Sequence, residues 1–395
     1  MGALSHIKVL DLSRVLAGPW ASQILADLGA EVIKVERPGV GDDTRSWGPP
    51  FLKDRAGDDT AESAYFLCTN RGKQSVCIDM KTPEGQETVR LLADECDVVL
   101  ENFKVGGAAK FGIDYATLAA RNPALVYCSI TGFGQNGPYK DRPGYDFLVQ
   151  AMGGLMSVTG QADGEPGAGP QKVGVALTDI MTGLYATVGI LAALTERDRS
   201  GLGQFVDLAL LDVTAATLAN QASNYLVGGT VPSRLGNAHP NIVPYQSFVA
   251  ADGHLIVAVG NDAQFGRFVA ALGRPELADD ERFATNRARV KNRDALVPLL
   301  QRQMLERGKN EWLQILEAVK VPAGPINSIA EVFAEPQIQA REMQIELAHP
   351  QNPHLQLVGN PIKLSRTPVE YSRPPPTLGQ HTEAVLARLK GVSTQ

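Results

Sequence analysis

The sequence is poor in the residues that build disulfide frameworks and metal sites. Only four of its 395 residues are cysteines, and six are histidines. No two cysteines have the Cys-x-x-Cys spacing of a zinc or redox motif, and no two histidines have the His-x-x-x-His spacing of a helical metal site. We therefore expect no metal and no disulfide, and we expect a reducing, cytoplasmic location.

Positive charge and long apolar runs are also scarce. Lys and Arg number 37 against 43 Asp and Glu, and the net charge of -6 argues against a nucleic-acid partner. The N-terminal residues lack the charged and apolar regions of a signal peptide. One run, 174–194, approaches the length of a membrane span. It contains Asp179 and many small residues, so we interpret it as a buried helix and expect no membrane association.

The sequence is rich instead in short apolar runs that alternate with amphipathic stretches. The first is a strand–helix–strand unit over 7–35, and such units build parallel sheets flanked by helices. Strands are predicted over 7–12, 31–35, 74–79, 97–101 and 125–130, and helices over 17–28, 82–95 and 179–196. Thr82 before Pro83 is typical of a helix N-cap. The pattern predicts an α/β fold with a doubly wound, Rossmann-like large domain.

The pattern changes after residue 200. A hairpin over 248–259 and helices over 263–272 and 293–309 predict a smaller α+β domain. The proline-punctuated C-terminal residues cannot form a core of their own. We therefore expect a large α/β domain over 1–210, a linker over 211–234, a small α+β domain over 235–330, and a segment over 331–395 that returns to the large domain.

A glycine-rich motif invites comparison with dinucleotide-binding proteins. Residues 132–137, Gly-Phe-Gly-Gln-Asn-Gly, follow a predicted strand and match Gly-x-Gly-x-x-Gly. That fingerprint also needs a helix that opens at the third glycine, so that its N-terminus meets the pyrophosphate. Pro138 and further loop residues follow here, which favours a tight loop. The alternative interpretation of the motif is an NAD(P)-binding site, which would make the protein an oxidoreductase.

Two charged turns adjoin predicted strands. Arg37 and Arg45 flank an acidic pair after the second strand, and residues 70–73, Asn-Arg-Gly-Lys, precede the third. Such clusters are usually solvated loops. The functional alternative for each is an anchor for a phosphate or a carboxylate.

Asp179 stands out because it is the only charged residue between Lys172 and Glu196. An aspartate there is suited to be the N-cap of the long helix. It could equally be a buried partner of a distant arginine. A carboxylate at the edge of an apolar segment also suits a nucleophile or base, since burial perturbs its chemistry. Composition and spacing leave these three interpretations open.

Several longer motifs together resemble one known family across nearly the whole chain. They are VLDLSRVLAGPWASQILADLGAEVIKVERP (9–38), GDDTRSWGPPF (41–51), NRGKQS (70–75), DMKTPEG (79–85), ENF (101–103), ITGFGQNGP (130–138), GYDFLVQAMGGLMSVTG (144–160), GVALTDIMTG (174–183) and GPIN (324–327). This set resembles the family III CoA-transferases, which include formyl-CoA transferases, carnitine CoA-transferases and α-methylacyl-CoA racemases. The subgroup that moves CoA from succinyl-CoA to glutarate or hydroxymethylglutarate is the most similar.

The resemblance implies a role for particular residues and an unusual assembly. Asp179 falls on the catalytic aspartate of the family. The positions that contact coenzyme A, which enters as the acyl-CoA substrate, correspond to Val15, Ala17, Arg37, Ile78, Asn102, Phe103 and Lys110. The implied assembly is an interlocked homodimer, in which two ring-like chains thread each other.

Two departures from the family pattern bear on the reaction. The racemase members have a catalytic histidine where this chain has Tyr145, which favours transfer over racemisation. The run of glycines over the active site of formyl-CoA transferases is missing from residues 235–245. A dicarboxylate acceptor would need a cation for its second carboxylate. Arg14, Arg45 and His239 are the candidates, with Tyr145 as a further substrate contact.

The resemblance implies a reaction with covalent intermediates. The Asp179 carboxylate would attack the donor thioester, and the mixed anhydride would release CoA thiolate. The thiolate would then form an aspartyl-CoA thioester, which the acceptor acid would take up by the reverse steps. An α-methylacyl-CoA racemase is the alternative on the same fold, and a non-catalytic CoA-binding protein is a third possibility.

Overall fold

The computed structural model describes residues 2–389 and 391. Met1, Lys390 and 392–395, which the expected domains 1–210 and 331–395 include, lie outside the described residues. The chain forms two compact units. The first comprises Met1–Gly154, Val173–Thr217 and Pro336–Gln395, and the second comprises Leu155–Lys172 and Leu218–Glu335.

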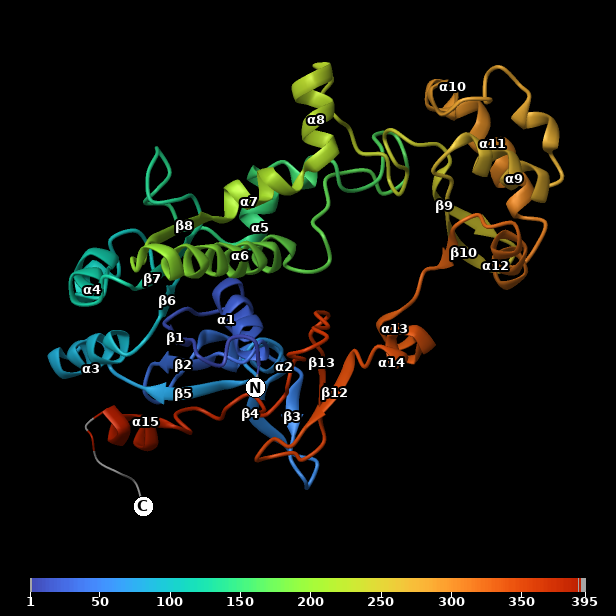
Figure 1. The fold of residues 1–395 in the computed structure, drawn as a ribbon. Coiled ribbons are helices and arrows are strands. Elements are labelled where there is room, and N and C mark those ends of the chain that lie inside the picture. Colours follow the sequence, from blue (N-terminus) through green and yellow to red (C-terminus); the bar gives the residue numbers. More distant parts are fainter. Residues whose placement is uncertain (1, 390, 392–395) are drawn as a thin grey trace. The chain divides into compact units, whose positions relative to one another are not determined.

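The first unit is built on a six-stranded sheet in which every neighbouring pair is parallel. Its strands are β1 (Lys8–Asp11), β2 (Glu31–Glu36), β5 (Lys73–Cys77), β6 (Val98–Glu101), β7 (Val126–Thr131) and β8 (Phe205–Ala209). The spatial order is β5-β2-β1-β6-β7-β8 (Figure 1). Numbered along the chain this is 3-2-1-4-5-6, the order of doubly wound sheets. The predicted α/β class is confirmed.

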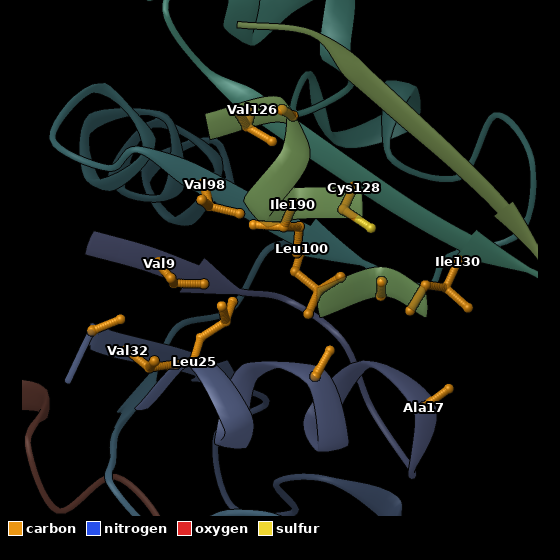
Figure 2. Packing of buried hydrophobic residues seen from close by; sticks show 14 of the residues in the cluster. Val9, Ala17, Leu25, Val32, Val98, Leu100, Val126, Cys128, Ile130 and Ile190 are labelled. Atoms are coloured by element: carbon orange, nitrogen blue, oxygen red, sulfur yellow. The ribbon is translucent and has the colours of Figure 1, made fainter. Parts of the chain in front are cut away.

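Alternating side chains of these strands bury two separate apolar clusters. Val9, Val32 and Leu100 belong to one cluster, whereas Leu10, Ile33 and Val99 belong to the other. Successive side chains of a strand point to opposite faces, so both faces of the sheet are covered. Figure 2 shows the first cluster, in which strand residues lie against Leu25 and Ile190 of two helices.

The three helices predicted in the first unit are present as α1 (Ala17–Asp27), α3 (Pro83–Asp94) and α6 (Leu177–Ser200). The unit has further helices that were not predicted, namely α2 (Ala64–Leu67), α4 (Tyr115–Arg121), α5 (Asp146–Met152), α7 (Leu210–Thr217), α14 (Pro336–Ala340) and α15 (Thr382–Leu389). The short 3-10 turns are η1 (Asp43–Ser46) and η2 (Ala109–Phe111). The predicted cap is confirmed, because the Thr82 hydroxyl accepts a hydrogen bond from the Gly85 N–H at 3.0 Å. A typical cap of this kind contributes about 1 kcal/mol.

The long apolar helix is α6, predicted over 179–196. It is the one helix among residues 2–389 that is long and apolar enough to cross a membrane. Ala186, Ile190 and Ala193 are nevertheless buried in the core. They pack where α6 runs beside α1 (Figure 1). This packing is that of a core helix.

The first unit also has two small hairpins, the second of them in its C-terminal residues, which make an edge contact as well. The hairpins are β3 (Phe51–Lys53) with β4 (Asp59–Ser63), and β12 (Gln344–Leu347) with β13 (Leu355–Val358). Beyond them the chain reaches β5, the outermost strand of the sheet. The His381 N–H donates to the Ser75 carbonyl at 2.9 Å, and the Cys77 N–H donates to the Thr382 hydroxyl at 3.0 Å.

The second unit has its own apolar core around a three-stranded sheet. The predicted hairpin corresponds to β9 (Tyr245–Ala250) and β10 (Gly253–Ala258), with β11 (Ala323–Pro325) pairing on β10. Its helices are η3 (Leu155–Ser157), α8 (Ala219–Gly228), α9 (Asp262–Ala271), η4 (Pro275–Ala278), α10 (Asn286–Lys291), α11 (Arg293–Met304), α12 (Lys309–Ala318) and α13 (Ile329–Ala334). Phe248, Phe265 and Trp312 are buried in this core.

The observed boundaries differ from the expected ones at two places. Residues 211–234 were expected to be a linker, but they form most of α7 and all of α8, in different units. Residues 155–172 were expected in the large domain and belong to the second unit. Both differences arise because the chain crosses between the units several times, which local periodicity does not reveal.

Candidate functional site

A cavity opens at the carboxyl edge of the parallel sheet, where the strand order reverses between β1 and β6. Its volume is about 410 Å³. Three of its sides are formed by residues 14–17 after β1, by residues between 102 and 110 after β6, and by residues 130–132 at the end of β7. Lys140, residues 142–145 and Asp179 also line it. Ligands of doubly wound proteins bind in this crevice because the loops on either side diverge there.

Most of the charged side chains that line this cavity are basic. Five line it, and within the described residues Asp179 is its only acidic group; the five are Arg14, Lys104, Lys110, Lys140 and Arg142. Four of them are exposed, namely Lys104, Lys110, Lys140 and Arg142. A net-negative protein therefore presents a local positive patch beside one carboxylate, and such a patch suits an anionic ligand.

Asp179 is the third residue of α6, not its N-cap. The N-cap is Ala176, which has no capping side chain. The Asp146 carboxylate of α5 supplies the missing acceptor: its Oδ1 accepts from the Thr178 N–H at 2.8 Å and from the Asp179 N–H at 3.3 Å. Of the three interpretations of Asp179, the N-cap is therefore wrong.

No cation pairs with Asp179 within residues 2–389 and 391, so the interpretation as a buried partner of an arginine is wrong as well. Its pKa is raised to about 7, first by burial and second by the neighbouring charge of Asp146. Both causes disfavour the ionised form. An unpaired carboxylate that titrates near neutral pH and faces a cavity has the properties of a reactive group.

Close helix packing places Asp179 beside the turn after β1. Gly183 lies one helical turn after Asp179, where α6 meets the start of α1. A Cβ atom at Gly183 would lie 2.7 Å from the Ala17 carbonyl oxygen, so this approach requires glycine. The approach brings the first turn of α6 and residues 14–17 to the same cavity.

The turn after β1 is held from the neighbouring strand. Asn102, which follows β6, accepts from the Arg14 N–H at 2.9 Å and donates to the Arg14 carbonyl at 2.7 Å. Val15 has a φ of 72°. A β-branched residue in the left-handed region costs roughly 1–3 kcal/mol. The surrounding bonds therefore maintain a backbone conformation that the residue itself disfavours.

A second cavity of about 350 Å³ adjoins the first and shares Arg14 and Phe103 with it. Arg37 lines this second cavity. Arg14 and Arg37 each donate to a different oxygen of Asp43, at 2.7 and 2.6 Å. Phe103 contacts Phe111 with ring centroids 6.1 Å apart. Two guanidinium groups beside an aromatic surface suit a ligand that carries both phosphate and a flat ring.

Most of the sequence-predicted contact residues lie in or beside these two cavities. Val15, Ala17, Asn102, Phe103, Lys110, Arg14 and Tyr145 line the first, and Arg37 lines the second. Ile78 is buried in the core, 5% exposed, and immediately precedes Asp79 on the wall of the second cavity.

Arg45 is placed differently from the expectation that it meets a substrate carboxylate. It lines neither cavity, and its guanidinium bonds to Glu36 at 2.8 Å and to Glu62 at 2.7 Å with its side chain 7% exposed. Arg45 belongs to the η1 turn, and its side chain is buried in the fold. Arg45 therefore forms buried structural ion pairs.

His239 belongs to the second unit. Its ring contacts Tyr245 with centroids 5.3 Å apart, and its Nδ1 accepts from the Asn241 N–H at 3.0 Å. Burial, followed by the nearby charge of Arg293, lowers its pKa. A histidine held neutral in this way is a weak partner for a carboxylate.

The remaining motifs have structural explanations. Residues 132–137 form a loop, with Gly134 and Gly137 at positive φ, and no helix opens at the third glycine. This geometry lacks the helix N-terminus of an NAD(P) site. In the basic turn at 70–73, Arg71 pairs with Asp27 at 2.6 Å, and the buried Lys73 pairs with Asp11 at 3.1 Å. Neither serves as a free phosphate anchor.

Sequence reasoning missed three residues that shape the site: Asp146, Asp42 and Lys34. Asp146 stands next to Tyr145 in a stretch that the motifs already marked, but nothing in the spacing indicates that it reaches residues 32 and 33 positions later. Asp42 had the appearance of an acidic surface pair with Asp43. In the structure Asp42 is buried, 2% exposed, and lies against the turn after β1.

Comparisons with known proteins show the family to which the chain belongs. Residues 4–382 match the profile of CoA-transferase family III. The succinate–glutarate CoA-transferase of Agrobacterium fabrum is 53% identical over 98% of this chain and 96% of its own. The human succinyl-CoA:glutarate CoA-transferase is 44% identical over 97% of this chain and 85% of its own.

A solved structure extends the likeness to the fold. The crystal structure of a CaiB/BaiF family protein from Brucella suis has a TM-score of 0.86 and 50% sequence identity, and it covers 98% of this chain and 99% of its own. A profile match over nearly the whole length and relatives of this identity identify the protein as a CoA-transferase. The chain belongs to CoA-transferase family III.

Proposed function

We propose that this protein moves coenzyme A from succinyl-CoA to a dicarboxylic acid such as glutarate, with Asp179 as the nucleophile. The observation that carries the proposal is the cavity itself, in which one unpaired carboxylate faces a wall of basic side chains. Relatives at 53% and 44% identity bear names for this donor and acceptor.

The chemistry that we assign to Asp179 uses its carboxylate twice. An oxygen of Asp179 attacks the thioester carbonyl, the C–S bond breaks, and the products are a mixed anhydride and CoA thiolate. The thiolate then attacks the aspartyl carbonyl, which gives an aspartyl-CoA thioester and releases succinate. The acceptor carboxylate attacks that thioester and the same steps run in reverse. A carboxylate suits this role because it is both nucleophile and leaving group.

The two adjoining cavities divide the work of holding the substrate. We assign the phosphates and the adenine of CoA to the second cavity, where Arg37, Arg14 and Phe103 lie. The thioester end then extends past Val15 and Asn102 to Asp179 in the first cavity. Lys110 and the other cations of the first cavity neutralise the remaining negative charge.

Racemisation is the less favoured reaction on this fold. Tyr145 lines the cavity with its side chain exposed, in the position of the racemase histidine. A tyrosine in place of the histidine leaves the cavity without the imidazole that would accept an α-proton. Transfer needs no such base.

A panel of acceptor acids tests the proposal. With succinyl-CoA as the donor, glutarate and similar dicarboxylates should form their CoA esters at least about 10-fold faster than monocarboxylates of equal length, because a hydrogen-bonding site rejects a ligand that leaves it unpaired. Formation of each acyl-CoA is measured by liquid chromatography. Equal rates with pentanoate and glutarate, which both have five carbons, would reject the dicarboxylate preference. Deuterium uptake at the α-carbon of a branched acyl-CoA would favour the racemase instead.

We further propose that the working form is a homodimer in the cytoplasm. Both units carry exposed apolar side chains that a second copy would cover, among them Val188 at 63% in the first unit and Leu226 and Val227 at 78% and 90% in the second. Patches of this kind mark protein interfaces. All four cysteines are free thiols, which suits a reducing compartment.

Sedimentation analysis checks the dimer. The purified chain should sediment at twice its monomer mass down to micromolar concentration, and Val188→Asp should shift it toward monomer. The exposed surface substitution Glu306→Gln is the control and should leave the dimer intact. A native chain that sediments as a monomer at all concentrations contradicts the proposal.

A further inference from the structure

Val15 is a backbone anomaly inside the proposed catalytic cavity. Its φ of 72° lies in the left-handed region, which a β-branched residue rarely adopts. It lines the cavity together with Asp179. Such a conformation persists only where the surrounding structure imposes it. The question is which groups impose it.

A buried ion pair forms hydrogen bonds to the backbone on both sides of this turn. Lys34 of β2 donates to the Ser13 carbonyl at 2.8 Å, and the Val15 N–H approaches both oxygens of the Asp42 carboxylate at 3.3 Å. Lys34 and Asp42 pair with each other at 2.9 Å, and neither side chain is exposed. A carbonyl and an N–H two residues apart are therefore fixed relative to one rigid pair.

The pair is itself anchored from other elements. Asp42 accepts from the Thr44 N–H at 3.0 Å and from the Thr44 hydroxyl at 2.8 Å, which begins the η1 turn. The turn itself is also held by β1, because Asp11 at the end of that strand accepts from the Ser13 N–H at 2.9 Å. Burying two charges costs desolvation, and apolar residues of similar size are often as stabilising. The geometry that this pair imposes, and not stability, is thus its distinctive contribution.

We propose that Asp42, fixed by Lys34, is a positioning residue that holds the turn at Val15 in its left-handed conformation beside Asp179. The inference rests on the proposed transfer reaction at Asp179. Asp42 lines the second cavity but not the first, so it acts on the first through the backbone of Val15. If the Val15 N–H is released, the turn relaxes toward negative φ and its residues shift relative to Asp179.

A double-substitution cycle tests the coupling without relying on activity. Glycine adopts positive φ freely, so Val15→Gly should raise the thermal midpoint of the native chain relative to Val15→Ala, which retains the Cβ atom. In an Asp42→Asn background the turn has already relaxed. There Val15→Gly should give no such gain over Val15→Ala. Equal gains in both backgrounds would overturn the inference.

Transfer kinetics supply the second readout. Asp42→Asn should lower kcat/KM by about 10- to 100-fold, the size expected when a reacting group is misplaced by about an ångström. Val15→Gly should restore part of this loss in the double variant, because the turn can again populate positive φ. A merely structural role for Asp42 predicts no such rescue. Native kcat/KM in Asp42→Asn would also overturn the inference.

A matched control separates positioning from general destabilisation. Asp27→Asn breaks another buried ion pair, with Arg71, whose side chains are 3% and 6% exposed. It should lower the thermal midpoint while leaving kcat/KM of the folded protein unchanged. If Asp42→Asn does not fold, the inference is tested by the thermal midpoints of Val15→Gly and Val15→Ala in the otherwise native chain. Equal midpoints would show that Val15 is not strained and would overturn the inference. If the thermal midpoints show coupling between Asp42 and Val15 but the native chain transfers no CoA, the result rejects the proposed function and leaves the positioning of Val15 by Asp42 intact.

Discussion

Replacing Asp179 by asparagine is expected to lower CoA transfer at least about 1,000-fold, as is usual when a covalent nucleophile is removed. The amide has nearly the shape of the carboxylate but cannot form the anhydride. Transfer from succinyl-CoA is measured by the appearance of the acceptor's CoA ester. Transfer at the native rate would refute the mechanism.

The same variant should remain folded. Burial raises the pKa of Asp179 to about 7 in the folded chain, above its ordinary value of 3.8. The folded state therefore holds the proton more tightly than the unfolded state, and stability is lost as pH rises between these two values. Asparagine carries no charge, so at pH 8 the variant should melt no lower than the native chain.

A control and a trapping experiment complete this test. Asp212, an exposed aspartate in the first turn of α7, is the matched residue, and Asp212→Asn should transfer CoA at the native rate. Hydroxylamine added during turnover should modify the peptide that contains Asp179 in the native chain only. Modification of a different carboxylate would assign the nucleophile elsewhere.

The second large effect is that of pH on the rate of CoA transfer. Only the carboxylate form of Asp179 attacks a thioester, and its pKa is raised to about 7. The kcat/KM of the native enzyme should therefore fall about tenfold for each pH unit below 7, to roughly 100-fold below its plateau at pH 5. Rates are compared with the thermal midpoint at each pH, so that unfolding is not mistaken for protonation. A flat profile from pH 5 to 8 would contradict the assignment.

Asp146→Asn tests the cause of the raised pKa. Its charge is the second contribution, after burial, that disfavours ionisation of Asp179. Asparagine retains an oxygen that can accept from the Thr178 N–H, so the start of α6 stays capped. The acid limb of the pH profile should move to lower pH, because the like charge is gone. A limb that stays in place would show that burial alone sets the pKa.

Local patterns in the sequence predicted the elements of the sheet well. The strand expected over 31–35 is β2, Glu31–Glu36, and the strand expected over 125–130 is β7, Val126–Thr131. Apolar runs of this length and a helix cap such as Thr82 depend on neighbours along the chain, which the sequence displays directly. The unit boundaries were less accurate, because chain crossings between units have no local signature.

The sequence by itself determined the α/β class, the family and the conspicuous position of Asp179. Only the tertiary structure decided what surrounds that residue. It showed that Arg45 forms buried ion pairs with Glu36 and Glu62 and does not line the site. It brought Asp146 to the start of α6. The physical reason is that a carboxylate's charge state and role depend on its neighbours in space, and here those neighbours come from distant parts of the chain.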